Sequence, residues 1–373
     1  MTDINVAASP AATALAAFLA TAHPHRELAA CHGVLTPAEL DARATEIEAL
    51  ATAAAVHDLG WLRRVAVRGD DRLRWLNGMV TNSINALAAG AGAWNLVLNA
   101  QGRIQGDLTV WRDNEDLELE IEASQSDRLL AHLEHFIIMD DVELSPVEGG
   151  TAIGLSGPKA HEVLSKLGLP VLPDGLTQSD AQFDGLPVLV RRGYGPLTDH
   201  YAVWIAADHA GALWKALADA GARPVGCVAL EAFRIAEGIP AYGVDIVERD
   251  LPQETSQMRA LHFNKGCYLG QEIVERIRSR GNVHRHLRSL ELHGPVPGPG
   301  TKLSLDGAEA GHITSAAELP LAEGARIFAL SMIRAEAEQP DRPLMYSAGE
   351  ANGTARLLAG PPQLSNELER QRI

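Results

Sequence analysis

The sequence predicts an α+β protein with an all-β domain at its C-terminal end. Hydrophobic residues make up 46% of the 373 positions and charged residues 21%, which is ordinary for a globular protein and unlike a disordered chain. The pattern of strand, glycine turn and helix occurs in two places with the same offsets, which indicates two similar lobes. From Arg285 onward, short strands alternate with Gly and Asp, as is typical of a small β-barrel or sandwich.

Charge and cysteine usage limit the partners and the compartment. The chain has 32 Lys and Arg against 48 Asp and Glu, a net charge of −16, so we expect neither nucleic acid nor a membrane surface as a partner. No apolar run approaches the ~18 residues of a membrane-spanning helix. No Lys or Arg precedes Arg26, so a secretory signal is not expected. Three widely separated cysteines without a C-x-x-C motif favour the reducing cytoplasm.

The first 58 residues are predicted to be an N-terminal arm followed by one helix. Residues 1–35 show only a loose pattern. The stretch Thr36-Pro37-Ala38-Glu39 has the form of a capping box with proline at the first helical position, and it predicts a helix that begins there and ends near residue 55.

Residues 59–284 are predicted to hold the two lobes, and residues 285–373 the β domain. In the first lobe we expect strands at 65–68, 94–98, 104–111, 117–122 and 142–144, with helices after Gly69 and at 127–137. In the second lobe we expect strands at 153–156, 188–191 and 201–205, and helices after Gly157, at 207–220 and at 228–236, the last ending at Gly238.

Basic residues gather between Met258 and Arg288. Seven cations stand against Glu272 and Glu275, a local balance of +5 in a chain of −16, and they are Arg259, Lys265, Arg276, Arg278, Arg280, Arg285 and Arg288. This contrast marks a candidate anion site. A solvated basic helix face paired with acidic neighbours is the alternative.

The same window contains a candidate reactive thiol. Cys267 lies between Gly266 and Gly270, with Lys265 nearby and a helix predicted to follow. Positive charge and a helix N-terminus both stabilise a thiolate, so we expect Cys267 to be the functional thiol and Lys265 its activator. Cys227, in an apolar run, is predicted to be a small buried residue, and Cys31 remains undecided.

No motif for a metal, a P-loop or a serine hydrolase stands out. The paired histidines lack a Cys or carboxylate in ligand spacing, so no metal is expected; they are His23/His25, His132/His135 and His284/His286. The sequence contains neither G-x-x-x-x-G-K-[ST] nor G-x-S-x-G.

The stretch Lys265–Glu272 resembles the signature K-G-C-Y-x-G-Q-E of the YgfZ family. These are folate-binding proteins of the glycine-cleavage T-protein superfamily that assist iron–sulfur enzymes. Similar stretches occur from residue 59 to the C-terminus, at 67–82, 98–103, 230–245 and 251–255. The resemblance implies three domains around a central channel for tetrahydrofolate.

The resemblance also implies which residues bind the cofactor. Leu62 and Trp94 match positions that contact the pterin or benzoyl rings, and Asn99 lies at the turn of the pocket. Arg234 matches an arginine at the benzoyl-glutamate end, where a guanidinium can hold a carboxylate by two hydrogen bonds. Glu254 belongs to a matching P-Q-E segment. An ordinary core tryptophan and a buried structural salt bridge are the alternatives for Trp94 and Arg234.

One departure bears on whether the protein is an enzyme. Aminomethyltransferases of the superfamily carry an aspartate pair just before the leucine of this strand, and the first aspartate acts near the folate. This sequence has Gly106-Asp107 there, so glycine stands at the acting position, and the Y-T-G-E motif is absent at 193–197. Glycine cannot serve as an acid or base. The expected function is therefore a tetrahydrofolate-binding accessory protein that supports assembly or repair of iron–sulfur clusters in client proteins. The alternatives are a folate-dependent aminomethyltransferase or other one-carbon transferase, and an interaction module without a ligand.

Overall fold

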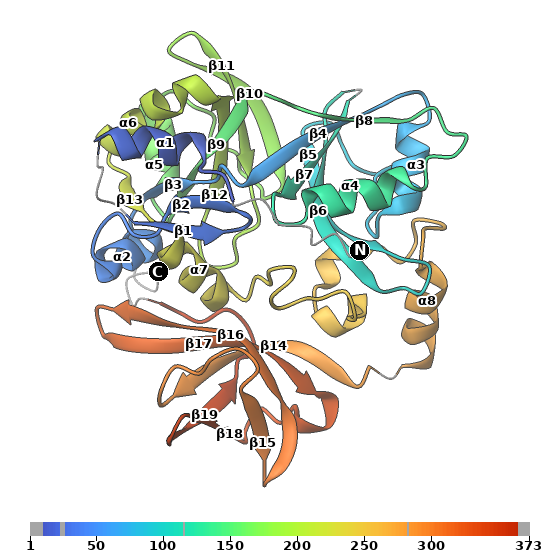
Figure 1. The fold of residues 1–373 in the computed structure, drawn as a ribbon, viewed down its shortest axis with the longest axis vertical. Coiled ribbons are helices and arrows are strands. Elements are labelled where there is room, and N and C mark those ends of the chain that lie inside the picture. Colours follow the sequence, from blue (N-terminus) through green and yellow to red (C-terminus); the bar gives the residue numbers. More distant parts are fainter. Residues whose placement is uncertain (1–9, 23–26, 115, 282, 365–373) are drawn as a thin grey trace, which may run out of the picture.

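The computed structural model describes residues 10–22, 27–114, 116–281 and 283–364. A two-lobed part contains one large sheet and most of the helices, and a closed β-barrel lies below it (Figure 1). The residues before position 10 and the pair His23/His25 lie outside the described residues, as does the side chain of Arg280. The helices are α1 (Ala14–Ala22), α2 (Arg43–Thr52), α3 (Arg72–Met79), α4 (Ser126–Glu134), α5 (Ala160–Lys166), α6 (Ala210–Asp219), α7 (Cys227–Glu237) and α8 (Gln271–Arg280).

The large sheet has eleven strands in the order β13-β3-β9-β12-β11-β10-β5-β6-β7-β4-β8. Its two halves follow the same path through strand, helix, three strands, helix and strand, with β3 inserted in the second half, and a single residue pair between β5 and β10 joins them. The strands are β3 (Ala55–Asp58), β4 (Leu62–Arg68), β5 (Ala91–Leu98), β6 (Ile104–Arg112), β7 (Leu117–Glu122), β8 (Glu143–Pro146), β9 (Gly150–Ser156), β10 (Thr177–Phe183), β11 (Leu186–Arg192), β12 (His200–Ala206) and β13 (Arg223–Val225).

Alternation in β7 decides which side chains face the centre of the molecule. Leu117, Leu119 and Ile121 are buried in the core of the first lobe. Because successive side chains of a strand point to opposite faces, the intervening glutamates face the other way. Two of them, Glu120 and Glu122, line a central cavity.

The predicted helix at residues 36–55 is wrong in its start. Thr36 lies in β2 (Val34–Pro37), which pairs with β1 (Leu28–Cys31), and the helix begins only at Arg43. The Thr36 hydroxyl donates to Asp58 Oδ2 at 2.7 Å, so it satisfies a buried carboxylate instead of capping a helix. The expected loose arm is also ordered in part, because α1 packs on α6 and buries Leu15 in the second lobe.

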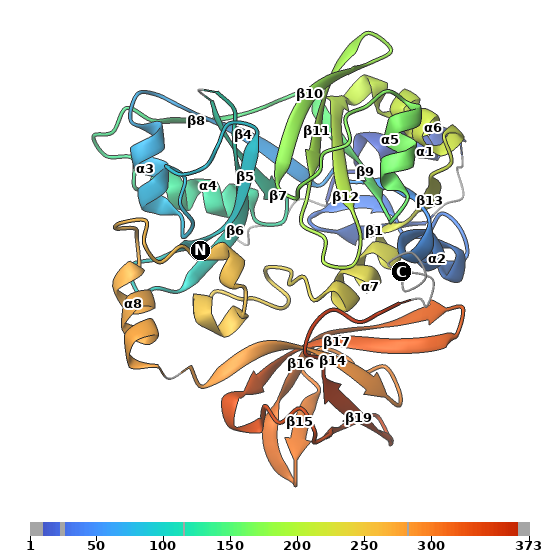
Figure 2. The ribbon, with the colours of Figure 1, turned by 180° about the vertical axis from the view of Figure 1, so that it is seen from behind.

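The barrel begins at Arg285, where the sequence pattern changes. Its strands close in the order β14-β17-β16-β15-β18-β19 and lie beneath α7 (Figure 2). The α+β class and the C-terminal β-barrel are therefore confirmed. The strands are β14 (Arg285–His293), β15 (Lys302–Leu305), β16 (Ala308–Leu321), β17 (Gly324–Arg334), β18 (Leu344–Ala348) and β19 (Ala351–Leu357).

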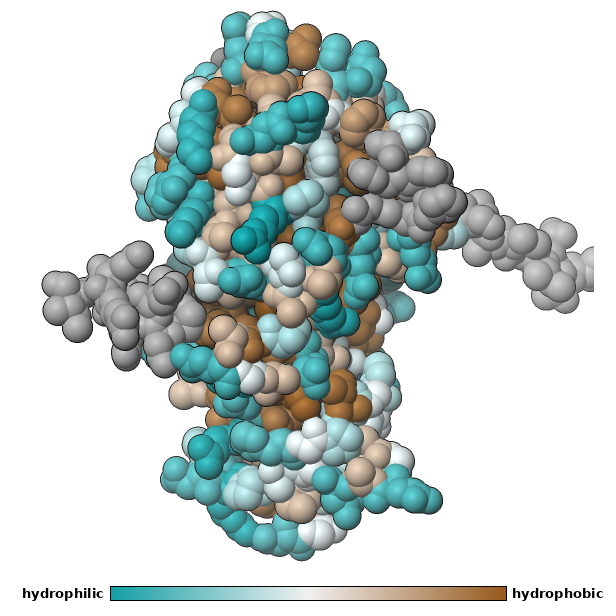
Figure 3. Space-filling view, turned by 90° about the vertical axis from the view of Figure 1, so that its left-hand side faces the viewer, coloured by the Kyte–Doolittle hydropathy of each residue, from teal (hydrophilic) through white to brown (hydrophobic). Residues whose placement is uncertain are grey.

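Hydrophilic residues cover much of the face shown in Figure 3, with small groups of hydrophobic residues between them on both the two-lobed part and the barrel. Within the described ranges, no helix combines the length and the apolar character needed to cross a membrane.

Arg191 connects the two lobes across the centre of the sheet. Its side chain is 2% exposed, on β11, and its guanidinium pairs with Glu118 and, at 2.8 Å, with Glu120 on β7. The same guanidinium lies 4.7 Å from the centroid of the Trp111 ring. Removing one partner of a buried ion pair leaves the other charge without compensation.

Replacement of Arg191 by alanine should therefore destabilise the protein strongly. We expect Arg191→Ala to lower the free energy of unfolding by about 3 kcal/mol, because Glu120 loses its partner in a buried setting. The control is Arg342→Ala at an exposed pair with Asp306, which should cost about 1 kcal/mol or less. Urea denaturation at neutral pH measures both. A loss no larger than that of the control would contradict this role.

Candidate functional site

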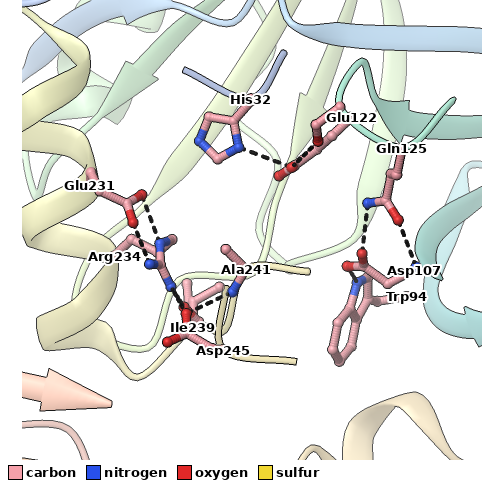
Figure 4. A network of polar contacts seen from close by, with 11 residues as sticks. His32, Trp94, Asp107, Glu122, Gln125, Glu231, Arg234, Ile239, Ala241 and Asp245 are labelled. Carbon is pink, nitrogen blue, oxygen red and sulfur yellow. Dashed lines mark hydrogen bonds and ion pairs between the residues drawn. The ribbon is translucent and has the colours of Figure 1, made fainter. Parts of the chain in front are cut away.

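A central cavity lies where the two lobes meet. It has two adjoining compartments of about 260 and 210 Å³. Residues of both lobes and of α7 line both compartments, and they include Leu62, Trp111, Glu120, Glu122, Tyr194 and Arg234. Figure 4 shows the polar groups of the cavity, with Asp107 on one side and Glu231 and Arg234 on the other.

Asp107 is a half-buried acid in the wall of this cavity. Its Oδ2 accepts a hydrogen bond from Trp94 Nε1 at 2.8 Å, and its Oδ1 accepts one from Gln125 Nε2 at 2.8 Å (Figure 4). Burial raises the pKa of Asp107 to about 6, and the nearby charge of Glu122 acts in the same direction. Asp107 can therefore exchange a proton near neutral pH.

The inference from Gly106 that the cavity lacks an acid is wrong. Gly106 faces α4, and a Cβ placed there would lie 2.7 Å from Gln125 Oε1 and 3.0 Å from Leu129. Because β6 alternates, the next residue points to the opposite face, and Asp107 lines the cavity. Both residues, Gly106 and Asp107, are visible in the sequence, but only the orientation of β6 shows which of them faces the cavity.

Arg259 lines the cavity, although the sequence identified it only as one of the cations between Met258 and Arg288. Its guanidinium lies 4.1 Å from the centroid of Trp94 and 3.9 Å from that of Tyr194, and its Nε donates to Gln257 Oε1 at 3.1 Å. Burial lowers the pKa of Arg259 to about 10. A cation between two aromatic faces, beside Asp107, gives this end of the cavity a positive and a negative group.

Arg234 is held by protein acceptors on all three of its nitrogens. Nε donates to Glu231 Oε2 at 2.9 Å and Nη1 to Asp245 Oδ2 at 2.8 Å, while Nη2 pairs with the other oxygen of Glu231 and Nη1 also reaches Ile239 O. Burial alone would lower the pKa of Arg234, but these two carboxylates raise it overall. This is the arrangement of the buried-salt-bridge alternative, and a contact of Arg234 with a cofactor carboxylate stays a prediction.

His32 and Glu122 form a second charged pair in the cavity. His32 Nδ1 lies 2.9 Å from Glu122 Oε2, and its ring stacks on Trp61 at 4.8 Å. Burial opposes charge on both groups, but their mutual attraction raises the pKa of His32 and lowers the pKa of Glu122. Each group therefore favours the charged form of the other.

The other predicted cofactor residues lie in different surroundings. Leu62 lines both compartments, and Trp94 lines the smaller one. Asn99 holds the turn between β5 and β6, because its Oδ1 accepts from the amides of Gln101 and Arg103 at 3.0 Å. Glu254 pairs with Arg285 at 2.9 Å at the entry to the barrel. Roles of Asn99 and Glu254 in cofactor binding stay predictions.

The Lys265–Glu272 motif lies outside the cavity lining. Cys267 is exposed. Lys265 Nζ donates to the carbonyl oxygens of Val80 and Asn82, at 2.6 Å each, and burial lowers its pKa to about 7. Lys265 therefore anchors the motif to the end of α3, and its role as activator of Cys267 stays a prediction.

The basic window does not form one patch. Arg285 pairs with Asp250 and Glu254, and Arg288 pairs with Glu338, whereas Arg259 lies in the cavity. Arg278, Arg285 and Arg288 of the predicted anion site are thus used in ion pairs with neighbouring carboxylates.

The structure also contains a chain of hydrogen bonds that the sequence did not predict. His57 Nε2 and His200 Nδ1 each lie 2.8 Å from Ser156 Oγ, and His200 Nε2 lies 2.8 Å from Glu237. Burial lowers the pKa of His57 to about 3, so His57 is neutral. These residues are far apart in the sequence and have no motif in common. Across the described ranges, no cluster of three or more His, Cys, Asp or Glu could hold a metal ion.

Comparison with known proteins identifies the family. The model of the GCVT N-terminal domain matches residues 27–265, which is more than half of the chain. The chain belongs to the GCVT family. The match includes the two lobes and every residue described above as lining the cavity in β4 to β7, and it ends inside the Lys265–Glu272 motif.

Relatives in the GCVT family support this assignment. The chain is 30% identical over 279 residues to a chloroplastic protein of Arabidopsis thaliana that is named provisionally as a transferase; the match covers 72% of this chain and 63% of that protein. It is 28% identical to an aminomethyltransferase of Rubrobacter xylanophilus, covering 74% and 75%. The crystal structure of glycine cleavage system aminomethyltransferase T from Bartonella henselae shares the fold, with a TM-score of 0.83, 19% identity and coverage of 93% and 97%.

The raised pKa of Asp107 predicts a pH dependence of stability. An exposed aspartate has a pKa of about 3.9, so the folded protein binds this proton more tightly than the unfolded chain. The contribution of Asp107 is greatest below pH 4 and is lost as the pH rises through 6. The Asp107→Asn variant has no carboxyl to titrate at this position, so its stability does not fall in this way. Its unfolding free energy relative to wild type should therefore rise by about 1–2 kcal/mol from pH 4 to pH 7.5.

Urea denaturation across this pH range measures the difference. Asp180→Asn, at an exposed position, controls for the loss of one surface charge. A difference between Asp107→Asn and wild type that does not change with pH would contradict the raised pKa.

Proposed function

We propose that the central cavity binds tetrahydrofolate and that the protein supports the assembly or repair of iron–sulfur clusters in client enzymes in the cytoplasm. The observation that carries the folate part is the half-buried Asp107, hydrogen-bonded to Trp94 in the wall of the cavity. The proposal for the clients rests on the Lys265–Glu272 motif, whose thiol is exposed. Membership of the GCVT family supports a folate-type ligand.

The residues of the cavity fit a reduced folate in size and chemistry. Ligand pockets usually measure about 300–1,000 Å³, and the two compartments together fall in this range. A carboxyl that can accept or donate at neutral pH suits the N–H groups and ring nitrogens of a pterin. The aromatic faces of Trp94 and Tyr194 suit its rings, and Arg259 between them supplies a positive charge.

The exposed thiol gives the protein a group that can act on a second macromolecule. Cys267 lies on a loop fixed by Lys265 to the end of α3, in front of α8. A sulfur in this position can contact a client protein, whereas the side chains that line the cavity cannot. In this proposal folate and client therefore use different surfaces of the molecule.

A second candidate function is one-carbon transfer with tetrahydrofolate. The specific observation in its favour is Asp107, because a cavity carboxyl with a pKa of about 6 can serve as a general acid or base. Incubation with tetrahydrofolate and aminomethyl or N-methyl donors, followed by mass spectrometry of the folate, separates the two functions. Turnover that is lost in Asp107→Asn and retained in Cys267→Ser would favour the transferase.

Calorimetric titration tests the folate proposal. Wild-type protein should bind tetrahydrofolate, and Asp107→Asn should weaken binding about tenfold, since it removes an acceptor that is buried with Trp94 and Gln125. Asp180→Asn, on the exposed part of β10, should bind as wild type does. Binding that Asp107→Asn leaves unchanged would remove the cavity from the proposal.

Complementation tests the role of Cys267. In a strain that lacks the gene and shows reduced iron–sulfur enzyme activity, Cys267→Ser should fail to restore activity. Its folate affinity and stability should remain close to wild type, because the side chain is exposed. Ser279→Ala on α8 is the control and should restore activity fully. Full restoration by Cys267→Ser would contradict a functional thiol at this position.

A further inference from the structure

Two cysteines that are far apart in the sequence meet in the cavity wall. Cys31 ends β1, and Cys227 is the first residue of α7. Both residues line the larger compartment together with His32, Glu231 and Arg234, and each thiol shifts the pKa of the other. The sequence predicted Cys227 only as a small buried residue. Cys227 is buried, but it lines the cavity together with a second thiol.

Backbone contacts hold the two cysteines in this position. The Ala38 amide donates to Glu27 O at 3.0 Å, and Ala38 O accepts from the Val228 amide at 3.2 Å, so the β1–β2 hairpin is tied to the first turn of α7. The hairpin lies beside α7 in both views of the ribbon (Figures 1 and 2). A Cβ at Gly226 would come within 2.2 Å of Ala38 O, so glycine allows this close approach.

The surroundings make the two thiols unequal. The hydrogen bond from Cys31 lowers the pKa of Cys227, and the charge of His32 acts in the same direction although burial opposes it. The hydrogen bond and burial together raise the pKa of Cys31. A thiol with a lowered pKa at a helix N-terminus, beside a thiol with a raised pKa, is the arrangement that reactive dithiols use, with one attacking sulfur and one resolving sulfur.

We propose that Cys31 and Cys227 form a redox-active dithiol, which a hydroperoxide such as hydrogen peroxide oxidises to a disulfide inside the cavity. The Cys227 thiolate attacks one peroxide oxygen, the O–O bond breaks, and a sulfenic acid forms while the second oxygen leaves as water after taking a proton. Cys31 then attacks the Cys227 sulfur, the S–O bond breaks, and a second water leaves. Two thiols and one hydrogen peroxide thus give one disulfide and two waters.

The disulfide would join the hairpin covalently to the helix that carries Glu231 and Arg234. His32, next to Cys31, holds Glu122 on the opposite wall. Oxidation therefore holds the hairpin and α7 together in the wall of the larger compartment. The proposal concerns these thiols alone and does not depend on the cavity holding a folate.

Thiol counting after mild oxidation tests this dithiol. The reduced chain has three cysteines and should give three thiols in denaturant. After a limiting amount of hydrogen peroxide it should give one, with Cys267 still open to iodoacetamide. Peptide mapping without reductant should find Cys31 linked to Cys227, with a loss of the mass of two hydrogen atoms. Dithiothreitol should restore three thiols.

Two matched variants test the order of the steps. In Cys31→Ser, dimedone should trap a sulfenic acid on Cys227, and in Cys227→Ser no trapping should occur on Cys31. If peroxide leaves both cysteines open to alkylation while Cys267 is consumed, or if it produces only sulfinic acid at Cys227, the redox pair is excluded. The wild-type map alone decides the main point if either variant fails to fold.

Discussion

The buried carboxylate of Asp245 is the contact on which the relative arrangement of helix α7, the loop after it and the barrel depends. Its Oδ2 accepts from Arg234 at 2.8 Å and from the Ala241 amide at 3.0 Å, and its Oδ1 accepts from the hydroxyls of Thr314 and Ser315 at 2.6 Å each. Helix α7, the loop after it and the barrel therefore share one charge. Because a buried charge without partners costs several kcal/mol, these parts keep one relative position.

This constraint explains the charge distribution of the cavity. Arg234 is committed to Asp245 and Glu231, so one wall is a closed ion-pair network. On the other wall, Asp107 has only neutral hydrogen-bond donors, and burial raises its pKa to about 6. Glu122, which faces the same space, is kept ionised by His32. The pKa values of two carboxyls in one cavity are thus shifted in opposite directions because their partners differ.

The three cysteines illustrate how position decides chemistry. Cys267 is exposed on an anchored loop, where a protein surface can meet it. Cys31 and Cys227 lie in the cavity wall, where only a small reagent can reach them. The motif around Cys267 is visible in the sequence, whereas the pairing of the other two depends on a hairpin packing against the first turn of a helix.

The sequence by itself determined the features that depend on near neighbours along the chain. Alternation in β7, the end of α7 at Gly238 with its positive φ, and the change to short strands at Arg285 all follow from local periodicity and turn chemistry. The resemblance in the Lys265–Glu272 motif, together with similar stretches from residue 59 onward, indicated the superfamily.

The tertiary structure decided everything that depends on distant residues. Thr36 has the pattern of a helix cap, but the buried Asp58 recruits its hydroxyl, and the helix begins at Arg43 instead. Gly106 was read as a missing acid, yet the pleat of β6 turns Asp107 into the cavity. Local patterns specify which faces are buried, but which polar groups meet across a cavity is set by the packing of the whole chain.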